Sequence, residues 1–211
     1  MSDQRLKLLL ISEASFAGIY IAFTRGLIFV YLVSIGNGVD GISLVVGVVA
    51  MVTTAVHILL YKKPSFLVNR VKEKFTFFHG LERILWIFIP LTNDTILIII
   101  IFSVINSLPT GSFMNLVTYG SLSEDEIKDV TSKRFAAFGV STLIGFALAM
   151  FLVALLPPDT KYFYIFLFGA LIGLMSTISV FLMKMSKVEG MQMPKGIEQP
   201  DRVFSTSSFL K

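Results

Sequence analysis

The first long apolar run of the chain, residues 11–35, carries an arginine close to its middle. A bilayer has a hydrocarbon core ~30 Å thick, which about 20 helical residues can cross at a rise of ~1.5 Å each. Placing Arg25 at the centre of a span costs roughly 2.5–3.5 kcal/mol on insertion scales, whereas each Leu, Ile, Phe or Val returns roughly 0.3–0.6 kcal/mol. From Phe16 to Ile35 there are eleven such residues, which together return ~3–7 kcal/mol. The run can therefore enter a membrane with its charge.

Five further apolar runs follow, separated by short polar or charged connectors. The expected spans are residues 11–35, 42–61, 76–91, 95–118, 135–156 and 162–185. The chain of 211 residues is 55% hydrophobic and has a mean hydropathy of +0.79, which is too apolar for an ordinary soluble domain. The sequence predicts an all-α fold, a polytopic membrane bundle of six transmembrane helices over residues 1–185. The polar stretch 186–211 predicts a disordered cytoplasmic tail.

Lysine and arginine are distributed unevenly over this layout. Fifteen of the 18 lie on the side that holds both termini and the connectors 62–75 and 119–134, whereas Lys161 alone lies on the other side. The remaining two, Arg25 and Arg83, fall within spans. By the positive-inside rule the richer side is cytoplasmic. The sequence thus predicts a multi-pass protein of the cell membrane with cytoplasmic N- and C-termini.

Several classes of function are disfavoured by composition and motifs. The chain has no cysteine and two histidines, so we expect no metal site and no cofactor. It contains neither a phosphate-binding loop nor the nucleophile turn of a serine hydrolase, and we expect no enzymatic activity. Topology and attraction to anionic membrane lipid explain the basic residues, so nucleic acid is not an expected partner.

Two stretches of the sequence resemble the N-terminal six-helix half of a major facilitator superfamily transporter. The family's first helix, external turn and second helix are similar to FVYLVSIGNGVDGISLVVGVV. Its fourth-to-fifth connector and fifth helix are similar to SEDEIKDVTSKRFAAFGVSTLIGFALAMFLVALLP, where Arg134 precedes a helix with Gly139 and Gly145. The resemblance covers about residues 11–185.

The family also has a signature between helices two and three, roughly G-x-L-a-D-r-x-G-r-r. The corresponding stretch here is FLVNRVKEK, in which Arg70 matches, Asn69 replaces Asp and Lys72 replaces Gly. By this resemblance, Arg70 and Arg134 are candidates for a gating role in the cytoplasmic connectors.

The resemblance implies a half-sized secondary transporter of a small-molecule substrate, working by alternating access. Family members have two such halves and this chain supplies one. The resemblance therefore implies a homodimer or a separately encoded second half. The alternative is a non-transporting membrane scaffold or a truncated transporter remnant.

Helix one lines the substrate cavity in the resembling family, which makes Arg25 the first candidate to bind an anionic substrate or a coupling carboxylate. It shares a stripe with Gly18, Ala22, Gly26 and Phe29 at helical spacing, and the small residues among them let a neighbouring helix approach. The alternative is a structural ion pair between Arg25 and Glu82.

Helix four, another cavity-lining helix of the family, carries a second set of candidates. Its polar stripe consists of Ser103, Asn106, Ser107 and Thr110. These residues either hydrogen-bond a substrate, above all through Asn106, or join neighbouring helices. Pro109 leaves a backbone carbonyl that a serine or threonine can satisfy.

Three other features of the sequence are two buried or boundary carboxylates and a pair of glycines. Glu82 is either a proton carrier or a partner of Arg83, and the peripheral place of helix three in the family favours pairing. Glu13 is expected at the inner membrane boundary, where solvation explains it. Gly169 and Gly173 form a G-x-x-x-G motif, which serves either internal packing or dimerisation.

Overall fold

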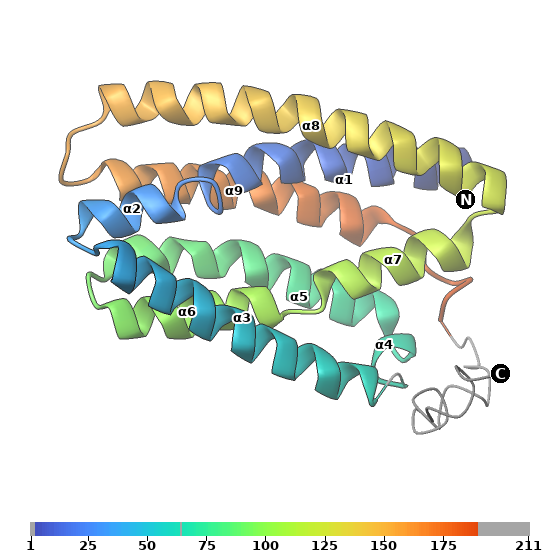
Figure 1. Ribbon diagram of the computed structural model, residues 1–211. Helices are drawn as coiled ribbons and strands as arrows, with labels where there is room; N and C mark the ends of the chain where they lie inside the picture. Colours follow the sequence, from blue (N-terminus) through green and yellow to red (C-terminus); the bar gives the residue numbers. More distant parts are fainter. Residues whose placement is uncertain (1–2, 64, 190–211) are drawn as a thin grey trace, which may run out of the picture.

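The computed structural model describes residues 3–63 and 65–189, and within them all regular secondary structure is helical (Figure 1). The prediction of an all-α fold is confirmed. In chain order the elements are α1 (Asp3–Phe23), α2 (Ile28–Ser34), α3 (Val39–Tyr61), α4 (Ser65–Val68), α5 (Val71–Leu85), the 3₁₀ helix η1 (Trp86–Leu91), α6 (Thr95–Ser107), α7 (Thr110–Ser121), α8 (Glu124–Leu155) and α9 (Lys161–Leu182).

Five helical stretches are long and apolar enough to cross a membrane. They are Gln4–Ser34, Val39–Tyr61, Thr95–Ser121, Glu124–Leu155 and Lys161–Leu182, and they correspond to five of the six predicted spans. The residues predicted as a span at 76–91 belong to α5 and η1, which lie in the same bundle (Figure 1). They stand outside this group because α5 is a shorter helix and carries His79, Glu82 and Arg83. The described chain is thus a helical bundle with five membrane-length apolar stretches.

The first predicted span is divided in two around Arg25, which lies in a turn between α1 and α2. The N–H of Gly26 bonds to the carbonyl of Ile21 at 2.9 Å, one residue further back than in an α-helix. The hydroxyl of Thr24 also bonds to the carbonyl four residues earlier, at 2.7 Å, which competes with the helical ladder. Arg25 is therefore presented by an interruption in the span.

The fourth predicted span is divided in a similar way between α6 and α7. Pro109 has no N–H to donate and disfavours the helical conformation of the residue before it. Leu108 accordingly has an extended backbone, with ψ of 131°. Thr110 then begins α7. Asn106 and Thr110, both predicted site residues, consequently lie on opposite sides of the break.

The interior contains two large apolar clusters with a polar band between them. On α1 the band lies between Leu10 of one cluster and Tyr20 of the other, and a buried Glu13 falls in the interval. The corresponding interval on the other side runs from Phe75 of α5 to Trp86 of η1. Side chains join the two intervals, because Glu13 meets His79 and the hydroxyl of Tyr20 lies 3.5 Å from Glu82.

Small residues allow α1 to lie close to α8 and α9. A Cβ on Gly145 of α8 would lie 2.9 Å from the Cα of Ile19. On α9, a Cβ on Gly169 would lie 2.7 Å from a side chain of α1, and one on Gly173 would lie 2.7 Å from the ring of Tyr20. The G-x-x-x-G motif therefore serves internal packing, which was one of the two readings left open by the sequence.

The described chain continues past α9 along the bundle. Met183, Met185 and Val188 are buried in the same cluster as Leu10. The ammonium of Lys187 donates to the carbonyl of Ser121 at 3.1 Å. The first residues of the predicted tail are therefore packed against the bundle. The rest of that tail, from 190 to 211, lies outside the described residues.

Candidate functional site

A cavity of about 450 Å³ lies among α1, α5, α7 and α8, at the level of the polar band. Its charged lining consists of Glu13, Arg25, Glu82, Arg83 and Arg134. This volume is within the range of pockets that hold small organic ligands, roughly 300–1,000 Å³. The bundle therefore contains a ligand-sized, charged cavity between α5 and helices of three membrane-length stretches.

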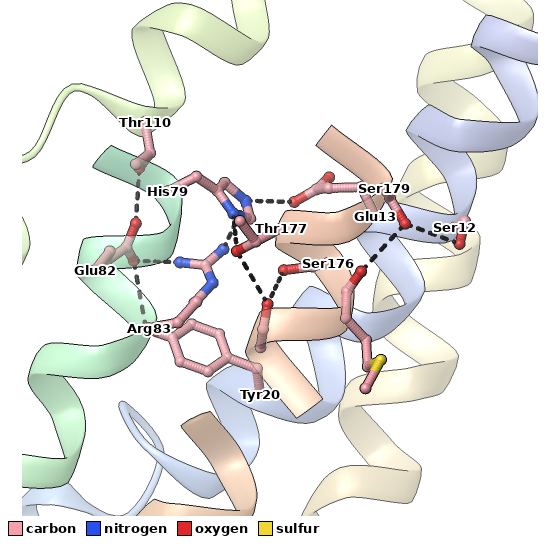
Figure 2. A network of polar contacts seen from close by, with 12 residues as sticks. Ser12, Glu13, Tyr20, His79, Glu82, Arg83, Thr110, Ser176, Thr177 and Ser179 are labelled. Atoms are coloured by element: carbon pink, nitrogen blue, oxygen red, sulfur yellow. Dashed lines mark hydrogen bonds and ion pairs between the residues drawn. The ribbon is translucent and has the colours of Figure 1, made fainter. Parts of the chain in front are cut away.

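Glu82 is the centre of the first half of the polar band (Figure 2). Its Oε1 lies 2.8 Å from the Nη1 of Arg83 and 3.1 Å from the Nη2 of Arg25. Its Oε2 accepts a hydrogen bond of 2.8 Å from the hydroxyl of Thr110. The Nη1 of Arg25 also donates to the Oδ1 of Asn106 at 2.9 Å. The two interrupted spans are thus joined to α5 by a single carboxylate.

Glu13 and His79 form the second half of the band. The Oε2 of Glu13 accepts from the Nη2 of Arg134 at 3.0 Å, and its Oε1 lies 3.4 Å from the Nε2 of His79. The same Nε2 lies 3.0 Å from the Nη2 of Arg83. The Nδ1 of His79 lies 2.8 Å from the hydroxyl of Thr177 on α9. Contacts therefore continue from the Arg25 turn to α8 through adjacent side chains.

The charges of the cavity are balanced to within one. Three guanidiniums, of Arg25, Arg83 and Arg134, face two carboxylates, of Glu13 and Glu82. The side chain of Glu82 is only 5% exposed and that of Arg83 only 6%, so removing either one would leave the other as an unpaired buried charge. Arg25 is different, because 37% of its side chain is exposed. The surplus positive charge and the accessible Arg25 suit the cavity to a small anion.

The guanidiniums also keep unused donors. The Nε atoms of Arg25, Arg83 and Arg134 are buried and have no hydrogen-bond partner among the described residues. A guanidinium holds its five N–H donors in a fixed, planar fork and binds carboxylates and phosphates in pairs of hydrogen bonds. The Nη donors of these arginines bind Glu13 and Glu82, whereas their Nε donors have no partner among the described residues.

The structure brings together most of the predicted site residues, though in different roles. Arg25, Glu82 and Thr110 line the cavity. Asn106 lies behind Arg25 and holds its guanidinium, while its own amide donates to the carbonyl of Phe102 at 2.8 Å. Ser103 is buried in α6 and is not part of the cavity lining.

The two candidate gating arginines are placed apart. Arg134 lines the cavity from α8 and pairs with Glu13. Arg70 lies before α5 with a left-handed backbone, φ of 52°, and its exposed side chain is 3.9 Å from that of Glu73. Arg70 therefore has no contact with the cavity among the described residues.

The expectation for Glu13 is wrong. Solvation was expected to explain this residue, but only 6% of its side chain is exposed and both of its carboxylate oxygens face charged or imidazole groups. Its four-residue spacing with Ala17, Ile21 and Arg25, all of which line the cavity, is the sequence signal that could have found it.

The residues of the stripe predicted around Arg25 face different helices. Gly18 and Gly26 lie against α8, because a Cβ on either would meet Phe138 or Phe146 at 2.5 Å. Arg25 instead points to α5 and α6, where Glu82 and Asn106 hold it.

No protein-family profile, curated protein or solved structure matches the chain.

Proposed function

We propose that the chain is a half-sized secondary transporter of a small anionic solute, in which two halves work together by alternating access. The observation that carries the proposal is the cavity of about 450 Å³ lined by three arginines and two glutamates, at the place where two apolar stretches are interrupted. Interrupted helices in corresponding positions of two repeats are a common sign of a transporter's substrate site.

The packing of the helices supports such a repeat. If the first three stretches (α1–α2, α3 and α5–η1) are exchanged with the last three (α6–α7, α8 and α9), the contact of α1 with α8 becomes that of α6 with α3. Likewise the contact of α1 with α9 becomes that of α6 and α7 with α5, and the contact of α5 with α9 is unchanged. The two interrupted stretches correspond under this exchange. This pairing agrees with the resemblance to one half of a major facilitator superfamily transporter.

The exposure of Arg25 supports a second half. A charged side chain near the middle of a span faces protein or a water-filled cavity rather than lipid. Within one copy, 37% of the Arg25 side chain is left uncovered. A second copy of the chain, placed over the cavity, would cover this face and enclose a pathway.

The alternative is a membrane scaffold in which Arg25 is purely structural, and a specific observation favours it. Arg25 already has a carboxylate partner, Glu82, at 3.1 Å and an amide partner, Asn106, at 2.9 Å. In that case Arg25 would contribute to stability in the same way as Glu82 does.

The test compares Arg25→Ala with Arg5→Ala, which alters an exposed arginine of the same stretch. The purified protein is reconstituted in liposomes, and uptake of acetate, lactate and inorganic phosphate is measured. Hydrogen bonds to charged groups contribute about 1.5–3 kcal/mol, so Arg25→Ala should reduce uptake of the transported anion about 10–100-fold. Arg5→Ala should leave it unchanged.

The outcomes separate the two functions. A transporter retains its fold and its mass in mild detergent when Arg25 is replaced, but loses uptake. If Arg25→Ala unfolds the protein as Glu82→Ala does, and the unsubstituted protein takes up none of the three anions, the scaffold explains the site. A protein that remains a monomer in both detergent and lipid nanodiscs would contradict the paired-half arrangement.

A further inference from the structure

His79 lies between a permanent cation and a carboxylate, and both face the same ring nitrogen (Figure 2). The Nε2 of His79 is 3.0 Å from the Nη2 of Arg83 and 3.4 Å from the Oε1 of Glu13. The side chain is 2% exposed, so water does not supply an alternative partner for that nitrogen. Its second nitrogen, Nδ1, is 2.8 Å from the hydroxyl of Thr177.

These contacts define the neutral form of His79. A guanidinium N–H can only donate, so the hydrogen bond from Arg83 requires an Nε2 without a proton. The proton of the neutral ring then lies on Nδ1 and is donated to Thr177, whose hydroxyl in turn lies 3.4 Å from the carbonyl of Gly173. In this form the Oε1 of Glu13 receives no hydrogen from His79.

The protonated form satisfies the other neighbour. An Nε2–H donates to the Oε1 of Glu13, and Arg83 loses its acceptor on the ring. We propose that Glu13 and His79 form a proton-binding site of the cavity, in which uptake of one proton moves Nε2 of His79 from accepting from Arg83 to donating to Glu13. One N–H bond forms on the imidazole, one hydrogen bond is broken and one is made.

The groups around His79 favour the pair of Glu13 and His79 as the proton-binding site. The charged groups that act on His79 are Glu13 of α1 and Glu82 and Arg83 of α5, while α9 contributes the neutral Thr177. One step further away, Arg134 of α8 pairs with Glu13, and Tyr20 of α1 lies beside Arg83 and Glu82. Both oxygens of Glu82 already accept from arginine or threonine donors. The Oε1 of Glu13 faces a group that can gain or lose a proton, because imidazole titrates close to neutral pH in general.

The charge of the cavity couples this proton to an anion. With neutral His79 the three guanidiniums exceed the two carboxylates by one charge, and a proton makes the excess two. A monoanion in the cavity reduces this excess and so favours the protonated form, and by reciprocity the proton favours the anion. This coupling rests on the proposed transport function, whereas proton binding by Glu13 and His79 does not.

The first experiment observes the proton directly. The protein is labelled with ¹⁵N-histidine, placed in lipid nanodiscs and titrated by NMR between about pH 5 and about pH 8.5. The chain contains two histidines, and His57→Gln assigns their signals. We expect His79 to carry its proton on Nδ1 at high pH and to gain a second proton on Nε2 at low pH. If the His79 ring stays neutral throughout, or if its neutral form carries the proton on Nε2, the proposal is overturned by this experiment alone.

Glu13→Gln then tests whether the proton is shared. A carboxylate within ~4–6 Å changes a titration midpoint by about 1–3 pH units, so the midpoint of His79 should move by at least about one unit toward acid. The signals of His57 provide the control, since its Nδ1 lies 2.8 Å from the backbone carbonyl of Thr53 and should be unaffected. An unchanged midpoint of His79 overturns the role of Glu13.

Uptake of inorganic phosphate into liposomes tests the coupling, because phosphate does not cross the bilayer as a neutral acid. An inwardly directed proton gradient should accelerate uptake several-fold by the unsubstituted protein and should not accelerate it in His79→Gln, each rate being compared with that of the same protein at equal pH. Equal acceleration of both proteins overturns the coupling. If the NMR titration behaves as expected but no anion is taken up, the proposed function fails and the proton site stands.

Discussion

The two sides of α1 are packed by different means. Toward α8 and α9 its contacts depend on small residues, and Gly145 approaches the backbone of α1 so closely that a Cβ would lie 2.9 Å from Ile19. Toward α5 and α7 the neighbours leave a cavity of about 450 Å³ whose walls are held by Glu13, Glu82 and their arginines. One helix thus has a tightly packed side and a charged, open side.

The difference shows what each side can contribute. Close packing of small residues is a common way for helices to associate where lipid removes the hydrophobic driving force. A ring of buried charges adds little net stability, because desolvation offsets much of the attraction. The charged side is therefore the one whose arrangement calls for a functional explanation, and variants on the two sides should behave differently.

The largest effect is expected from Glu82→Gln on the charged side. It leaves Arg83 buried without its carboxylate and removes the ion pair of Arg25, and breaking a buried pair costs about 3–5 kcal/mol. Unfolding in detergent, followed by circular dichroism, gives the loss of stability. Glu73→Gln is the control on the same helix, because its pair with Arg70 is exposed and 3.9 Å long and should contribute about 0–1 kcal/mol. Similar losses in both variants would contradict a network held by Glu82.

A smaller effect is expected from Gly145→Ala on the packed side. The added methyl group meets the backbone of α1, and overpacking of this kind costs about 1–3 kcal/mol. Gly139→Ala on the same helix is the matched variant, because its Cβ would have no neighbour within 4 Å. Replacing a helical glycine there should stabilise the protein by about 0.5–1 kcal/mol. Shifts of the melting temperature in opposite directions in the two variants distinguish the packed face of α8 from its outer face.

The smallest of the three effects is expected from Asn106→Ala. The variant removes the amide that accepts from Arg25 at 2.9 Å but leaves the ion pair with Glu82 intact, so the loss should be about 1–2 kcal/mol. Asn69→Ala, at an exposed position, should change stability by less than about 0.5 kcal/mol. If Asn106→Ala is as damaging as Glu82→Gln, the amide rather than the carboxylate holds the turn.

The candidate site could be found from sequence only in part. Arg25, Glu82 and Thr110 were identifiable because a charge or a polar stripe in an apolar run has few neutral explanations. Glu13 was missed because its position near the start of the run allowed solvation as an explanation. The partner of Arg134 was also missed, since the family resemblance suggested only a connector residue and the structure places it against Glu13.

The sequence alone determined the all-helical fold, five of the six predicted apolar stretches of membrane length and the presence of an arginine inside the first. Those properties follow from the length and composition of each run, which depend on no distant residue. Tertiary structure decided the rest: that a turn at Arg25 directs it to Glu82, that Gly169 and Gly173 face α1, and that Glu13 meets His79 and Arg134. These contacts join residues that are far apart in the chain, and only the packing of whole helices sets which side chains share one cavity.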